Sequence, residues 1–178
     1  MDARQSLAAL LLALTAAVAG VEAQSRPSPR VADDVARSVS THSQLTIFDD
    51  VSARVSEGTV TLSGKVTAEY KKDGVARVVG RIDGVRAVQN RIAVLPSSPF
   101  DDELRYRVAR AIYGNAAFWR YANMPKPPIH VIVEHGRVTL TGVVSTEAER
   151  SLARSLATGL GELSVTNELR TESAFAGR

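Results

Sequence analysis

The pattern of hydrophobic and polar residues occurs twice along the chain, each time with the same succession of helix-like and strand-like periodicity. A period of two, typical of a strand with one buried face, holds in four short segments. Their alternating apolar residues are Val51, Ala53 and Val55; Val60 and Leu62; Ile129, Val131 and Val133; and Val138 and Leu140. The turn Ser56-Glu57-Gly58 joins the first pair and the turn at Gly136 joins the second. Each half of the chain therefore predicts a β-hairpin.

A helical period flanks each hairpin. The first helices are predicted from N-terminal acids followed by an apolar face: Asp33, Asp34, Val35 and Val39, then Asp101, Asp102, Leu104, Val108 and Ile112. The second helices open at Thr67 or Ser145, whose hydroxyls can accept from free amides, and end at Gly84 and Gly161. Their apolar faces are Val75, Val78, Val79 and Ile82, and Leu152, Leu156 and Leu160. A last alternating segment follows each helix, so the predicted unit is αββαβ.

The two units are copies of one another. Gly58-Thr59-Val60-Thr61-Leu62-Ser63-Gly64 matches Gly136-Arg137-Val138-Thr139-Leu140-Thr141-Gly142 at an offset of 78, and after a one-residue deletion Gly84 and Asn90 match Gly161 and Asn167. A strand, helix and strand in this order should cross over on one face of the sheet. The predicted fold class is α+β: two tandem αββαβ modules, each a three-stranded mixed sheet packed by helices.

The segment boundaries follow from this duplication. We expect a signal peptide at 1–23, a flexible N-terminal tail at 24–32, the first module at 33–95, a proline-rich linker at 96–100, the second module at 101–170 and a C-terminal tail at 171–178. Leu7 to Ala19 is an apolar run too short to span a membrane, and Val21-Glu22-Ala23 is a small-residue ending that predicts cleavage near Ala23. The alternative is an uncleaved anchoring helix. After cleavage we expect no transmembrane segment and a periplasmic or secreted product.

Charge and composition limit the classes of partner that the chain could bind. Without residues 1–23 the chain carries 21 basic and 17 acidic residues, a net charge of +4. This excess suits an anionic membrane or glycan and is too dispersed to indicate nucleic acid. The chain has no cysteine, which excludes disulfides, thiolate chemistry and a lipoprotein anchor.

The repeated pattern of a glycine turn, alternating apolar residues and a valine-x-asparagine strand resembles the BON domain, named for bacterial osmotically inducible and nodulation proteins. The residues that carry it are Gly58, Gly64, Gly84 and Asn90, repeated as Gly136, Gly142, Gly161 and Asn167. The resemblance implies an envelope protein, often induced by osmotic stress, with affinity for phospholipid and no known enzymatic chemistry. It does not account for ten extra residues between the first helix and the first strand of the second copy.

Five of the nine aromatic residues lie in or just before this excess, among basic residues. The candidate lipid- or partner-binding residues are Tyr113, Phe118, Trp119, Tyr121, Arg107, Arg110, Arg120 and Lys126, with Tyr106 nearby. Tryptophan and tyrosine favour the headgroup zone of a bilayer, and neighbouring cations attract acidic lipids. The alternative is that the aromatic rings pack the excess residues onto the sheet.

Enzymatic chemistry has no support in the pattern. His42, His130 and His135 are isolated, so we expect no catalytic residue, no metal site and no cofactor. Asn90 and Asn167 should each cap a backbone group near the second helix. The resulting hypothesis is an exported, non-catalytic envelope protein that binds phospholipid or another envelope component and is linked to osmotic or envelope stress. The alternative is a periplasmic protein-interaction or chaperone-like adaptor that uses the same aromatic residues.

Overall fold

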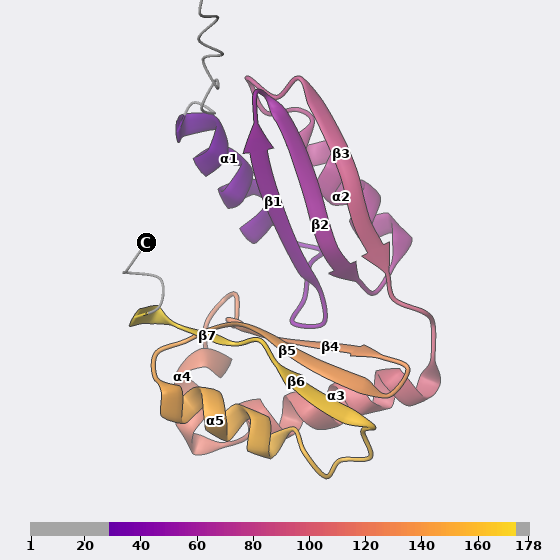
Figure 1. Cartoon of the computed structure of the whole chain (residues 1–178), viewed down its shortest axis with the longest axis vertical. Coiled ribbons are helices and arrows are strands. Elements are labelled where there is room, and N and C mark those ends of the chain that lie inside the picture. Colours follow the sequence, from indigo (N-terminus) through magenta and orange to yellow (C-terminus); the bar gives the residue numbers. More distant parts are fainter. Residues whose placement is uncertain (1–28, 174–178) are drawn as a thin grey trace, which may run out of the picture.

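The computed structural model describes residues 29–173 and contains two similar modules (Figure 1). The first consists of α1 (Pro29–Ser40), β1 (Asp50–Ser56), β2 (Thr59–Val66), α2 (Glu69–Val79) and β3 (Ala87–Val94). The second consists of α3 (Pro99–Tyr113), β4 (Ile129–Glu134), β5 (Arg137–Val144), α5 (Glu147–Leu156), β6 (Ser164–Asn167) and β7 (Arg170–Thr171). The extra residues of the second copy form η1 (Ala116–Phe118) and α4 (Trp119–Ala122). The predicted α+β fold of two tandem modules is confirmed.

The sheets have the same topology. In each, an antiparallel hairpin is followed by a crossover helix and a strand parallel to the second strand, giving the orders β1-β2-β3 and β4-β5-β6. The helices cover one face of each sheet, and the end of the first module meets the other face of the second sheet (Figure 1). Among the described residues, no helix is long and apolar enough to cross a bilayer.

The hairpin turns are as predicted. Glu57 and Gly58 have φ of 50° and 77°, and His135 and Gly136 have φ of 51° and 73°. Two successive residues with positive φ make the tight turn whose twist matches that of the flanking strands. In the second module Asp101, at the start of α3, accepts from the amides of both His135 and Gly136, at 2.9 and 2.8 Å.

Each module has its own core. In the first, Val35 of α1 packs with Val60 and Leu62 of β2 and with Val75 and Val79 of α2. The second core is larger and includes Leu104, Val108 and Ile112 of α3 and the aromatic rings of Phe118 and Tyr121. The η1 and α4 residues therefore contribute to the core of the second module.

The two asparagines make the same contacts in both copies, as expected. The Asn90 amide donates to Lys72 O at 3.2 Å, and the Asn167 amide donates to Arg150 O at 2.8 Å. Each side-chain oxygen also accepts from the amide two residues later, Ile92 or Leu169, at 3.2 Å. Each asparagine thus ties its last strand to its second helix.

Several predicted helix boundaries are wrong. Helix α1 begins at Pro29 with no acid in its first turn, so residues 29–32 are helical and not a tail. Pro99 and Phe100, expected in the linker, open α3 after the cap Ser98. Proline suits a first helical turn because its missing N–H would have no partner there.

The ends of the second helices also differ from expectation. The N-caps are Ala68 and Thr146, and only Thr146 makes a capping box, with Glu149. The helices end at Val79 and Leu156, several residues before Gly84 and Gly161. These two glycines, with φ of 90° and 99°, instead lie in the connection that leads to the last strand.

The C-terminal strand of the second module is split. Glu168 and Leu169 separate β6 from β7, and both strands pair with β5, which gives this sheet a fourth strand. Thr171, expected in the tail, belongs to β7. The predicted signal peptide lies outside the described residues.

Candidate functional site at the junction of the two modules

The aromatic residues of the second module divide between core and surface. Phe118 and Tyr121 are buried, whereas Trp119 between them is 61% exposed. The hydroxyl of half-buried Tyr113 donates to Ile129 O at 2.6 Å and accepts from Ile129 N at 3.1 Å. Burial raises the pKa of Tyr113 although the contact with the Ile129 backbone opposes this. The structure thus leaves Trp119 as the exposed ring of the η1–α4 segment.

The four candidate cations have different surroundings. Arg120 pairs with Glu149 Oε1 at 2.6 Å and lies over the Tyr121 ring, 4.4 Å from its centroid. Arg107 pairs with Glu103 at 3.7 Å. Arg110 and Lys126 take part in no ion pair of residues 29–173. The predicted basic residues therefore do not form one uniformly charged surface.

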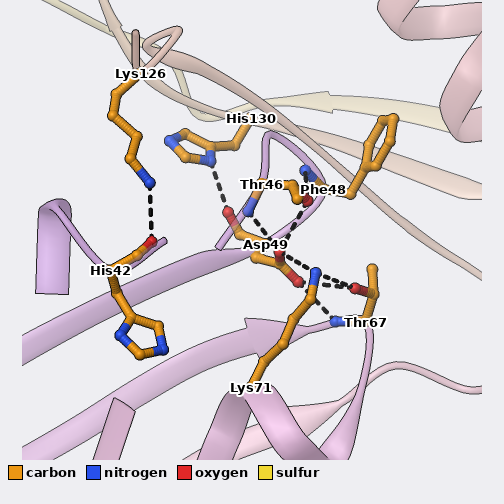
Figure 2. Close-up of polar contacts among 8 residues, drawn as sticks. All are labelled: His42, Thr46, Phe48, Asp49, Thr67, Lys71, Lys126 and His130. Carbon is orange, nitrogen blue, oxygen red and sulfur yellow. Dashed lines mark hydrogen bonds and ion pairs between the residues drawn. The ribbon is translucent and has the colours of Figure 1, made fainter. Parts of the chain in front are cut away.

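The segment between α1 and β1 binds the free edge of β4 (Figure 2). The amide of Val131 donates to Ile47 O at 2.7 Å, and Nδ1 of His130 lies 2.6 Å from Asp49 O. Because the partner is a carbonyl oxygen, His130 must carry its proton on Nδ1. The edge of the second sheet is thereby partly covered by the first module, which protects it from pairing with other strands.

Phe48 anchors the same segment. Its ring packs against the core of the second module and meets the Tyr106 ring edge to face, with centroids 5.2 Å apart. Two polar links lie nearby: Lys126 Nζ donates to His42 O at 2.8 Å, and Lys65 forms an ion pair with Glu134. Apolar and polar contacts therefore both join the modules.

Asp49 holds this segment from inside the first module (Figure 2). Its Oδ2 accepts from the amide of Thr46 at 2.8 Å and from Lys71 Nζ at 2.6 Å, and its Oδ1 accepts from the amide of Thr67 at 2.8 Å. The hydroxyls of Thr46 and Thr67 also donate to it, at 2.9 and 3.0 Å. Burial acts to raise the pKa of Asp49, but the Lys71 contact and the amides of Thr67 and Thr46 together lower it.

In the second module, a different side chain accepts the hydrogen bond from the backbone amide that precedes the second helix. The amide of Ser145, which corresponds to Thr67, donates to the hydroxyl of Tyr121 at 2.8 Å. Glu149 Oε2 accepts from that hydroxyl at 2.9 Å, and Glu149 corresponds to Lys71. Burial acts to raise the pKa of Glu149, but the bonds from Tyr121 and Thr146 and the charge of Arg120 lower it. A carboxylate with a lysine in one copy is thus replaced by a phenol with a glutamate in the other.

No periodic pattern in the sequence indicates a role for Asp49, Phe48 or Lys71 at the junction. The one available signal was a break in the repeat, because Pro127 occupies the position that corresponds to Asp49. Elsewhere, no three His, Asp or Glu side chains of the described residues gather where they could hold a metal ion. The arrangement at the junction is built of hydrogen bonds and packed rings.

Comparisons with known proteins agree with the duplication. The family model described as BON domain matches residues 29–96 and 101–173. A search of curated proteins found no match.

Among solved structures, two of the matches are to CdsD, a structural protein of the type III secretion system of Chlamydia trachomatis. Its C-terminal domain is 14% identical, with a TM-score of 0.32, over 81% of this chain and 66% of that one. A second CdsD structure is 16% identical, with a TM-score of 0.28, over 81% and 94%. Both scores are too low to support any inference about function. Because the two family matches cover most of the chain, the protein belongs to the BON-domain family, of which it carries two copies in tandem.

Proposed function

We propose that this protein is an exported, non-catalytic envelope protein that binds anionic phospholipid surfaces through the η1–α4 end of its second module, in a role linked to osmotic or envelope stress. The BON domain is a non-catalytic binding domain. The observation that carries the proposal is the exposure of Trp119. Phe118 and Tyr121 on either side turn inward, so Trp119 is held on a short, anchored helix and points to solvent.

An exposed tryptophan on an anchored segment suits the bilayer interface. Its ring is largely apolar and its indole N–H is polar, which favours the headgroup zone. Met124, two residues beyond α4, is 42% exposed and adds apolar surface. Because Phe118 and Tyr121 are fixed in the core, the backbone that carries Trp119 is already ordered. Contact with lipid therefore costs little further conformational entropy.

Cations support the same end of the module. Arg110 lies in the last turn of α3 and, within residues 29–173, has no carboxylate partner. A basic residue near an anionic surface contributes about 1 kcal/mol of attraction. Arg120 contributes less, because Glu149 neutralises it.

Co-sedimentation with phosphatidylglycerol vesicles tests the proposal. Trp119→Ala should lower the bound fraction severalfold, whereas Tyr70→Ala should not, although Tyr70 is exposed to a similar extent at 59% and lies in the first module. Equal binding by both variants would overturn the proposal. A protein partner captured through Trp119 without any dependence on lipid would favour the adaptor function instead.

A further inference from the structure

A cavity of about 730 Å³ opens between the two modules beside the contacts in Figure 2. It lies between the α1–β1 segment and the residues that lead into β4. A volume of a few hundred to a thousand Å³ between domains is typical of small-molecule sites. The proposed bilayer contact at Trp119 makes no use of it.

The walls of the cavity are largely apolar and come from both modules. The first module contributes Leu45, Ile47 and Val51, and the second contributes Pro125, Pro127 and Pro128. Removing a hydrocarbon chain from water onto such walls is favourable, at roughly 25 cal/mol for each Å² buried. The cavity therefore suits a ligand with an apolar body.

One cation on the wall, Lys126, suits an anionic head. Lys126 Nζ is held by His42 O at 2.8 Å, and among residues 29–173 no carboxylate neutralises it. His130 donates from Nδ1 to Asp49 O, so Nε2 of the neutral ring can only accept a hydrogen bond, for example from a hydroxyl of the ligand. A lysine ammonium has three donors, so Lys126 can bind a further acceptor without releasing His42.

Two acids, Asp49 and Asp50, also line the cavity. Asp49 lines the cavity, but its carboxylate is fully engaged by Thr46, Thr67 and Lys71 inside the first module. Asp50 lies opposite Lys65 in the β1–β2 register. These two residues line a second, smaller hollow. Asp50 and Val51 are both half-buried and both line the cavity, so the Asp50 carboxylate belongs to its wall.

From this combination we infer that the junction cavity binds a single-chain amphiphile with a monoanionic head, the chain lying on the apolar walls and the head beside Lys126. Free fatty acids and lysophospholipids share this chemistry. The inference concerns a different site from the bilayer contact and stands without it.

Amide NMR of the protein titrated with laurate and with lauroyl-lysophosphatidylglycerol, both below their micelle concentrations, tests the inference. Saturable shifts are expected at Val131 and Lys126, and dodecylammonium, with the same chain length and the opposite charge, should produce none. The tighter of the two anions identifies which head the site prefers.

Three variants define the site. Lys126→Gln should weaken binding about tenfold, as expected for the loss of one hydrogen bond to a charged group. Arg54→Gln removes the same charge from outside the cavity and should change the affinity little. Ser43→Trp, at an exposed residue of the lining, should block binding while circular dichroism shows an intact fold.

The result that overturns the inference is the absence of saturable shifts with either anion, or equal weakening by Lys126→Gln and Arg54→Gln. Trp119→Ala should leave laurate binding unchanged even if it abolishes vesicle binding. Failure of the cavity site and failure of the proposed function are therefore distinguished.

Discussion

Asp49 and Lys71 form an ion pair of 2.6 Å inside the first module, with side chains 0% and 6% exposed, and the backbone of the same Asp49 contacts His130 of the second module. The segment that docks on the second sheet is therefore held in place by a buried charge pair of the first. Stability of the first module and contact with the second are coupled through one residue.

Removing the lysine of this pair should be costly. Lys71→Met leaves the Asp49 carboxylate buried without its cation, and the free energy of unfolding should fall by about 3 to 5 kcal/mol in urea denaturation. Arg37→Met, which breaks the exposed pair with Asp34, should change it by less than about 1 kcal/mol. Similar small losses in both variants would contradict the structural role given to the buried pair.

The lowered pKa values of Asp49 and Glu149 make the free energy of unfolding depend on pH. The unfolded chain binds protons at these carboxyls first as pH falls, so their contribution is present above about pH 5 and is lost below it as each folded-state pKa is passed. Urea midpoints measured from pH 7 to pH 3 should therefore decline in acid. The urea midpoint of Asp49→Asn should decline less steeply with falling pH. Parallel curves for wild type and variant would contradict the contribution assigned to the Asp49 carboxylate.

Two glycines with positive φ offer a matched pair of substitutions. A Cβ at Gly142 would overlap the carbonyl oxygen of Pro128, whereas a Cβ at Gly159 meets nothing within 4 Å. Gly159→Ala should cost about 1 to 2 kcal/mol, from backbone strain alone. Gly142→Ala should cost more, because β4 must also move. Equal losses of thermal stability in the two variants would show that the close approach of the chain at Pro128 is unimportant.

Export is tested by the mass of the mature protein. The apolar run Leu7 to Ala19 and the ending at Ala23 predict a chain that begins at Gln24. Mass spectrometry of a periplasmic or culture fraction should find that product. Recovery of the chain only in the membrane, beginning at Met1, would favour the anchoring helix.

The repeated parts of the fold could be predicted because each depends on local patterns. The hairpins at Gly58 and Gly136 follow from alternation and turn chemistry, and the asparagine contacts follow from finding the same residue at corresponding positions. The start of α1 differs from the prediction because Asp33 and Asp34 predict a helix that begins beside them, whereas the helix begins at Pro29.

The junction could not be predicted, because its contacts join residues far apart in the sequence. Phe48 and Asp49 stand in a short segment without a period, so no pattern indicated that one faces the second module and the other the first. In the same way, α4 has four residues, too few for a helical period to show that Tyr121 turns inward and Trp119 outward. Burial of the aromatic residues, the alternative to lipid contact, holds for Phe118 and Tyr121.

The central claim is that Trp119 enters the headgroup zone of anionic membranes, and its fluorescence tests this most directly because it is the only tryptophan in the chain. With phosphatidylglycerol vesicles, the emission should shift to the blue and be quenched by lipids brominated near the headgroup. Molar salt should weaken both effects, because it shortens the screening length to about 3 Å. Emission that keeps its position and intensity with these vesicles, while the protein still sediments with them, would contradict the account.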